Sequence, residues 1–315
     1  MPTEGPIGLL STVGNEAFTR KINDHLFEIR MAHAQETQPL QASQPGFLRR
    51  NYYLQHELVR FQSGEGKGTL SDTVRGHDLF ILADVTNREP TYRYFHTTVP
   101  YSPDDHIQDV KRLILASNGK AKRIHVIMPY LYQGQQDLRH SRESLDCAII
   151  LKELIKLGVS SILTFEPHEP RVENAIPKSG LESIPVSYIM MKKLLEDDND
   201  LHFETENLMV VSPNESSIKR AIYYASNLGV QLGTFFRLRD YGRTVVGRNP
   251  IVSWEYLGES VEGKDILLID DMIQSGKTMI NTATQLKQEL GAKRVFCVTA
   301  FPLFTDGIES FNQAY

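Results

Sequence analysis

Short runs of apolar residues alternate with helical patterns along the whole chain. In the first half these runs predict β-strands, at 79–84, 123–130 and 160–165. Segments with helical periodicity separate them, at 104–117 and 141–157. The alternation then starts again, with strand patterns at 208–212, 234–238, 266–269 and 294–300 and helical patterns at 216–228 and 278–290. Strands that alternate with helices are typical of a mainly parallel sheet, so the pattern predicts an α/β protein with two similar halves.

The boundary between the two predicted halves falls near the helical and acidic segment 190–201. We therefore expect one domain over residues 1–189 and a second over residues 190–315. The stretch 34–46 is rich in Gln and Pro, which predicts a loop or linker.

Composition narrows the range of functions. The formal net charge is -5 and the pI is near 6.1, which argues against nucleic acid as the main partner. The two cysteines, Cys147 and Cys297, form no CxxC pair, so we expect a reducing compartment and no metal cluster. No apolar run is long enough for a membrane span or a signal peptide, which favours a cytoplasmic protein with no membrane partner.

The segment 266–278 carries candidate chemistry. Its Ser-Gly-Lys-Thr sequence at 275–278 looks like the end of a nucleotide-binding P-loop, but Asp271 stands where that loop needs a glycine. A second carboxylate, Asp270, precedes it, and two acids would repel a phosphate placed between them. The segment therefore does not predict a P-loop ATPase.

The same residues suit a ligand with a phosphate at one end and vicinal hydroxyls at the other, such as a sugar phosphate. A loop that opens a helix presents backbone N–H groups to a phosphate, and Ser275 and Thr278 add hydroxyl donors. The carboxylates of Asp270 and Asp271 can accept hydrogen bonds from ribose hydroxyls or hold a hydrated Mg²⁺. The alternative is an ordinary turn with Asp and Ser as helix caps, but paired acids before a phosphate cradle favour a site.

Several ordered segments between Phe61 and Gly307 together resemble the ribose-phosphate diphosphokinase family, also called phosphoribosyl pyrophosphate synthetase. They are RFQSGEG, TVRGHDLFIL, VIMPYLYQGQQDLRHSR, LTFEPHEP, VVSPNESSIKRA, ESVEGKDILLIDDMIQSGKTM and GAKRVFCVTAFPLFTDG. The resemblance implies two phosphoribosyltransferase-type domains, each a mainly parallel sheet flanked by helices. Compared with the family, the sequence stops at Tyr315, before a final strand and helix.

The resemblance implies a homo-oligomer that transfers pyrophosphate from Mg-ATP to ribose 5-phosphate, giving phosphoribosyl pyrophosphate and AMP, with Mg²⁺ as cofactor. The residues expected to hold ribose 5-phosphate are Asp270, Asp271, Gln274, Ser275, Gly276, Lys277 and Thr278. Those expected to hold ATP are Phe61, Ser63, Glu65, Gln135, Gln136, Asp137 and His168, the first three reaching the adenine of a neighbouring subunit. His168 and Asn214 match positions that hold Mg²⁺.

Some residues depart from the family pattern. Leu238 stands at the position of the catalytic lysine, and Arg237 and Arg239 are the cations expected to replace it. The other departures are Gln135 and Leu138 in place of arginines, Asn214 and Gln274 in place of aspartates, and Ser216 and Ser217 in place of two glycines. Each preorganised charge at such a site is typically worth about 10²- to 10³-fold in rate, so these changes bear directly on catalysis.

Three functions follow from these observations. A divergent ribose-phosphate diphosphokinase is expected first, because the segment that would hold the sugar phosphate is intact. A regulatory homologue that has lost most catalysis comes close behind, because the lysine and two arginines are replaced. A phosphoribosyltransferase comes last, since a simple transferase needs only one such domain.

Overall fold

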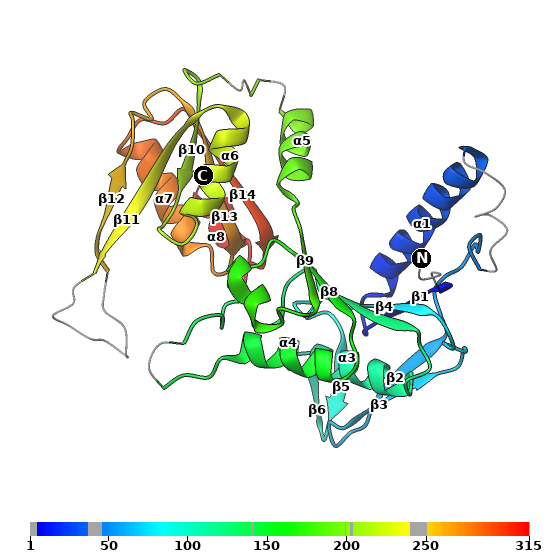
Figure 1. The fold of residues 1–315 in the computed structure, drawn as a ribbon. Coiled ribbons are helices and arrows are strands. Elements are labelled where there is room, and N and C mark those ends of the chain that lie inside the picture. The colour runs from blue at the N-terminus through cyan, green and yellow to red at the C-terminus, as the bar shows by residue number, and fades with distance from the viewer. Residues whose placement is uncertain are drawn as a thin grey trace. The chain divides into compact units, whose positions relative to one another are not determined.

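Figure 1 shows the chain as a computed structural model, which describes residues 5–36, 46–139, 142–198, 200–201, 204–239 and 251–314. It divides into two compact units, Met1–Ile184 and Pro185–Tyr315, called here the first and the second unit. The division lies between Ile184 and Pro185, whereas the sequence pattern placed it after residue 189. Each unit has its own five-stranded sheet and its own core.

The first unit is built on a parallel sheet with the strand order β1-β4-β7-β8-β9. The strands are β1 (Ile7–Ser11), β4 (Asp78–Leu82), β7 (Arg123–Ile127), β8 (Ser161–Phe165) and β9 (Gly180–Ile184). Connections that cross from one parallel strand to the next carry α3 (Pro103–Ala116), α4 (Asp146–Lys156) and the 3₁₀-helix η1 (Pro170–Ala175). Ser102 and Asp105 form a capping box that starts α3, with Pro103 in its first turn.

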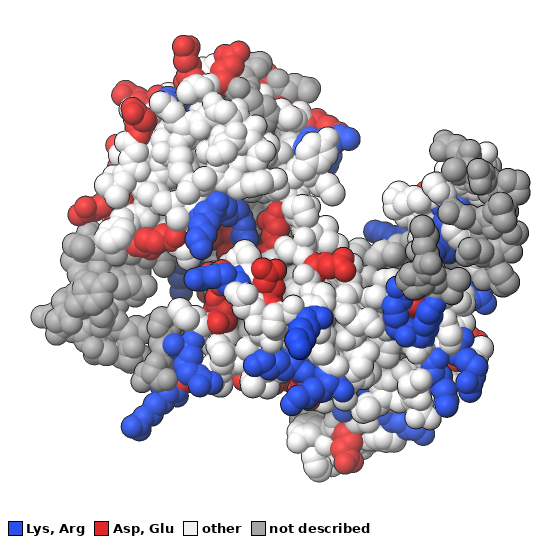
Figure 2. Space-filling model, viewed as in Figure 1, with Lys and Arg blue, Asp and Glu red and all other residues white. Residues whose placement is uncertain are grey.

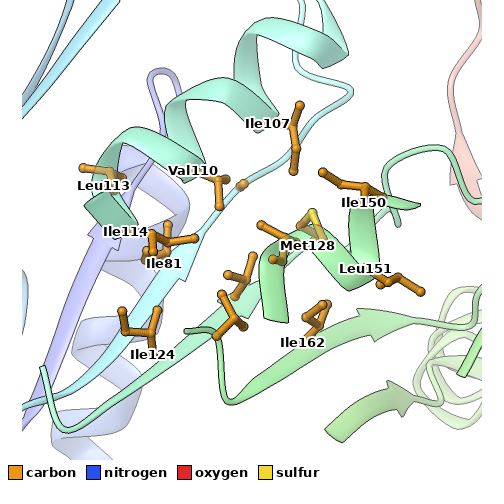
Figure 3. Packing of buried hydrophobic residues seen from close by; sticks show 14 of the residues in the cluster. Ile81, Ile107, Val110, Leu113, Ile114, Ile124, Met128, Ile150, Leu151 and Ile162 are labelled. Carbon is orange, nitrogen blue, oxygen red and sulfur yellow. The ribbon is translucent and has the colours of Figure 1, made fainter. Parts of the chain in front are cut away.

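One face of this sheet packs against α3 and α4. Figure 3 shows Ile107, Val110 and Leu113 of α3 and Ile150 and Leu151 of α4 lying over apolar side chains of the strands. On the other face Leu9 and Leu82 pack with α1 (Glu16–Glu36) and with the buried Tyr52. Burial on both faces is why the central strands read as nearly continuous apolar runs.

Two antiparallel hairpins complete the first unit. One joins β2 (His56–Arg60) to β3 (Gly66–Leu70), and the other joins β5 (Thr91–Tyr94) to β6 (Thr97–Pro100). Both are separate two-stranded sheets, and β3 packs against α3.

The second unit has the strand order β12-β11-β10-β13-β14, in which only the β11–β12 pair is antiparallel. The strands are β10 (Leu208–Ser212), β11 (Gln231–Arg239), β12 (Ile251–Leu257), β13 (Asp265–Ile273) and β14 (Arg294–Pro302). The helices are α5 (Ser187–Asp197), α6 (Ile218–Leu228), α7 (Lys277–Gln288) and α8 (Glu309–Ala314). Two clusters of buried apolar residues fill the two faces of the sheet, one with α7 and the other with α6.

The mainly parallel α/β fold predicted from the sequence is confirmed, but several element bounds were wrong. α4 begins at Asp146 and not at residue 141. α1 continues through Glu36, so the helix reaches into the predicted loop, whose residues 37–45 lie outside the described part. β13 continues beyond residue 269 to Ile273, because β14 keeps pairing with it there. Within the described residues, no helix combines the length and apolar character needed to cross a membrane.

Candidate functional site

The junction between β13 and α7 holds most of the residues predicted to bind ribose 5-phosphate. Asp270 and Asp271 are buried near the end of β13, and the turn that follows leads to Gly276. Gly276 is the N-cap of α7 in a left-handed conformation, with φ +85°, and as a glycine it has no side chain to cap the helix. Its carbonyl accepts the first hydrogen bond of the helix from Ile280 N–H, at 2.9 Å. The backbone N–H groups of the first turn are therefore directed toward the loop, as in helix termini that bind anions.

The two carboxylates of this junction have little access to solvent. Asp270 is 8% and Asp271 5% exposed. Burial, the largest cause, and the negative charge of Asp271 raise the pKa of Asp270 to about 6, although the hydrogen bond from Ser217 lowers it. A carboxylate that is costly to ionise gains from any ligand that brings hydrogen-bond donors to it, and vicinal ribose hydroxyls are such donors.

Gly276 also makes a close contact with the chain end. A Cβ atom at this position would lie 2.2 Å from Cε2 of Phe311 in α8, so only glycine fits. Phe311 in turn packs edge-to-face on Phe304, with ring centroids 5.2 Å apart. Beside this contact Lys277 is largely exposed and lies 3.9 Å from a carboxylate oxygen of Asp306. Sequence patterns did not indicate Phe311, because its contact with Gly276 depends on the return of the chain from β14.

The neighbouring junction, from β10 to α6, is closed by its own side chains. The Oδ1 atom of Asn214 accepts hydrogen bonds from the N–H groups of Ser216 and Ser217, at 3.0 and 3.1 Å, and from the hydroxyl of Ser216. Ser217 Oγ also donates to Oδ1 of Asp270. An Asn followed by serines after a strand is a known turn-forming pattern, which could have predicted the cap but not the link to Asp270.

The residues predicted to bind ATP lie on loops of the first unit. Gln135 and Gln136 are exposed after β7, Asp137 is half-buried beside them, and His168 is half-buried after β8. Two other residues of these loops, Gln133 and Glu166, have left-handed backbones with φ +57° and +32°. Such conformations cost energy in residues other than glycine and are frequent at binding sites.

Phe61, Ser63 and Glu65 lie in the turn of the β2–β3 hairpin. The ring of Phe61 is 49% exposed, and Ser63 Oγ donates to Oε2 of Glu65 at 3.0 Å.

Arg237, Leu238 and Arg239 lie in β11, where the pairing with β12 shifts in register between Leu238 and Arg239. Their side chains lie outside the described part of the structure.

The described residues do not form a resident metal site. Among the described residues no group of three or more His, Cys, Asp or Glu side chains is arranged to hold a metal ion. Asn214 Oδ1 already accepts hydrogen bonds from two N–H groups and from the Ser216 hydroxyl, so a metal ion there would have to displace them. Mg²⁺ commonly binds proteins through substrate phosphates and only one or two side chains, and this arrangement suits Mg²⁺ that arrives with a nucleotide.

Comparison with known proteins places the chain in a family. Residues 7–158 match the N-terminal domain of ribose phosphate pyrophosphokinase, and residues 179–309 match the phosphoribosyl transferase domain. A ribose-phosphate pyrophosphokinase of Ralstonia nicotianae is 30% identical over 252 residues, which cover 79% of this chain and 70% of that protein. The chain belongs to the ribose-phosphate pyrophosphokinase family.

Other members of the ribose-phosphate pyrophosphokinase family agree with this assignment. The enzyme of Thermosipho africanus is 28% identical over 254 residues, 80% of this chain and 72% of that one. The crystal structure of phosphoribosylpyrophosphate synthetase from Mycobacterium smegmatis superposes with a TM-score of 0.71 at 20% identity, over 94% of this chain and 81% of that one. The structural likeness supports the fold of both units.

Proposed function

We propose that the chain is a ribose-phosphate pyrophosphokinase, which transfers pyrophosphate from Mg-ATP to ribose 5-phosphate and releases AMP. The observation that carries the proposal is the β13–α7 junction, where two buried carboxylates precede a helix whose N-cap is glycine. A sugar phosphate has matching groups at both ends, hydroxyls for the carboxylates and an anion for the helix N-terminus.

Each residue of the junction has a role in this proposal. The carboxylates of Asp270 and Asp271 accept hydrogen bonds from the ribose hydroxyls, and Gln274 adds a side-chain amide. The 5-phosphate is held by backbone N–H groups and side chains of the turn and first helical residues, namely Ser275, Gly276, Lys277 and Thr278. Held in this way, ribose 5-phosphate presents its anomeric oxygen to the terminal pyrophosphate of ATP, so that binding energy is used to orient the reaction.

The nucleotide side of the proposal rests on the first unit. Gln135, Gln136, Asp137 and His168 hold the ATP phosphates, while Phe61, Ser63 and Glu65 of a second copy hold the adenine. On the face visible in Figure 2, most Lys and Arg side chains lie over the first unit, and such side chains can pair with the phosphates of a nucleotide. The proposal thus includes a homo-oligomer in which each site takes residues from two chains.

The transferred group develops negative charge, and fixed cations stabilise it. Arg237 and Arg239 are the proposed cations, because the intervening Leu238 cannot supply one. A lysine at residue 238 would add a charge where the family has it. We therefore expect turnover to be slow, and Leu238→Lys to raise kcat by about 10-fold or more with little change in KM.

A second function, that of a ligand-binding homologue with little catalysis, is favoured by the β10–α6 junction. The side chains of Asn214, Ser216 and Ser217 satisfy one another there, and Ser217 also engages Asp270. Their β-carbons and hydrogen bonds fill a turn that would otherwise offer backbone N–H groups to a pyrophosphate. Such a chain would bind ribose 5-phosphate and act through its partners.

The test is AMP release by the purified full chain with Mg²⁺, ATP and ribose 5-phosphate, with Asp271→Asn as the blank. AMP that needs ribose 5-phosphate, and disappears in the blank, supports the enzyme. Binding of ribose 5-phosphate in calorimetry without AMP release supports the second function. No binding of ribose 5-phosphate by folded protein would contradict both.

A further inference from the structure

The tip of the β5–β6 hairpin exposes two aromatic rings on the surface of the first unit. The rings of Tyr94 and Phe95 are 43% and 58% exposed, and they pack edge-to-face with centroids 4.9 Å apart. Aromatic rings that stay exposed contribute little to folding stability for their size. Their exposure side by side therefore indicates a surface that binds a partner.

The backbone conformation at the tip is also unfavourable. Tyr94 pairs with Thr97, so Phe95 is the first of two turn residues, and its φ is +49°. A hairpin turn with positive φ at this position normally takes glycine, because any side chain there is strained. The chain thus keeps a large aromatic ring in solvent at a position where glycine would be more stable.

The tip is joined to the turn of the β2–β3 hairpin that carries Phe61. Phe95 N–H donates to the carbonyl of Gln62 at 2.9 Å. A Cβ atom on Gly64 would lie 2.9 Å from Cε2 of Tyr94, so the Tyr94 ring packs directly on the backbone of that turn. The two tips therefore form one surface, in which the exposed rings of Phe61, Tyr94 and Phe95 accompany the carboxylate of Glu65.

A buried arginine braces the base of both hairpins. The guanidinium of Arg60, the last residue of β2, lies 5.2 Å from the ring centroid of Tyr92 and 5.0 Å from that of Tyr101. It also pairs with Asp109 of α3 at 3.1 Å. Because Tyr92 is in β5 and Tyr101 follows β6, this contact holds the two tips in register with each other.

We propose that Tyr94 and Phe95, together with Phe61, form the surface on which the purine base of ATP bound to a second copy of the chain stacks. The chemistry is that of a planar base, for which aromatic rings supply stacking and the Glu65 carboxylate accepts from an exocyclic amino group. This inference rests on the proposed function, in which the β2–β3 turn reaches a neighbouring nucleotide. It adds a hairpin that the sequence analysis did not assign to the site.

The test measures by calorimetry, in the presence of Mg²⁺, how the full chain binds two ligands. One is ATP, and the other is inorganic tripolyphosphate, which carries the charge of the ATP phosphates but has no base. Tyr94→Ala and Phe95→Gly are expected to weaken ATP binding by about 10-fold, within the range for loss of one stacked ring, and to leave tripolyphosphate unchanged. Phe95→Gly also removes the strained side chain, so its melting temperature should not fall. Phe95→Tyr keeps the ring and should bind ATP like the parent.

The matched control is Phe18→Ala, since Phe18 in α1 is also an exposed aromatic residue of the first unit, at 41%. ATP binding that weakens in Phe61→Ala but not in Tyr94→Ala or Phe95→Gly would overturn this inference and leave the proposed function in place. Equal weakening of ATP and tripolyphosphate would also overturn it, because the hairpin would then act on the fold or the assembly. A parent protein that binds no ATP would overturn both.

Discussion

Two strand-to-helix junctions of the second unit start from neighbouring strands of one sheet and end in opposite ways. At the β10–α6 junction Asn214 accepts the N–H groups of Ser216 and Ser217, so the turn satisfies itself. At the β13–α7 junction the N-cap is Gly276, which has no side chain of its own to accept N–H groups. The turn before α6 therefore uses its N–H groups internally, whereas the start of α7 has the properties of an anion site.

The difference shows that position in the fold does not by itself make a binding site. Both turns lie at the carboxyl edge of a parallel sheet, where ligands of α/β proteins usually bind. Side chains decide whether the backbone donors are used internally or left for a ligand. The two junctions are also connected, because the Ser217 hydroxyl donates to Asp270.

The largest effect is expected from Gly276→Ala, which breaks the open junction. The new methyl group would clash with Phe311, and alanine would be strained at φ +85°. We therefore expect a loss of about 2–4 kcal/mol of unfolding free energy in urea. The control is Gly229→Ala at the end of α6, which has φ +68° but no atom within 4 Å of the new Cβ. It should lose only about 1 kcal/mol. Equal losses in the two variants would show that the Phe311 contact contributes nothing.

The next effect is expected from Asp270→Asn, which removes the buried charge. Below about pH 4 the Asp270 carboxyl is neutral in both the folded and the unfolded chain, and its contribution to the free energy of unfolding is then fully favourable. That stability is lost as the pH rises through about 6, where the folded protein must ionise it. The variant should therefore be more stable than the parent by about 1–3 kcal/mol at pH 7.5, with the gain fading toward pH 4.5. The exposed Asp306→Asn is the control for general charge effects, and a gain independent of pH would contradict this cause.

A smaller effect is expected from Asn214→Ala, which opens the closed junction. The N–H groups of Ser216 and Ser217 lose their acceptor, so unfolding free energy should fall by about 1–2 kcal/mol in urea denaturation. Asn207→Ala removes only an exposed hydrogen bond to Glu204 and should change stability by less than about 0.5 kcal/mol. If Asn214→Ala were equally silent, the turn would not depend on its own cap.

The smallest effect on stability is expected from Lys277→Ala. Lys277 is 80% exposed at its side chain and lies 3.9 Å from Asp306, a distance at which surface ion pairs contribute little. Thermal unfolding should be nearly unchanged, while the affinity for ribose 5-phosphate should fall several-fold at low salt and less at high salt. Lys287→Ala at the other end of α7 is the matched control, and the same loss of affinity there would remove any specific role for Lys277.

The sequence by itself determined the fold class and most of the central strands, because residues buried on both faces of a parallel sheet leave long apolar runs. It also predicted the paired acids and the helix after them, since these are contiguous in the chain. The short hairpins and β9 were not found, because their strands are half-exposed and have no clear alternation. The bounds of β13 depended on its partner β14, which a local pattern cannot contain.

Only the tertiary structure decided how the candidate residues are used. The link from Ser217 to Asp270 spans 53 residues, and the contact of Phe311 with Gly276 spans a whole strand and helix. The exposed rings of Tyr94 and Phe95 became informative only when their hairpin was found against the turn that follows Arg60. Sequence patterns report burial and local propensity, whereas hydrogen-bond partners and strain at a site arise from segments that meet only after folding.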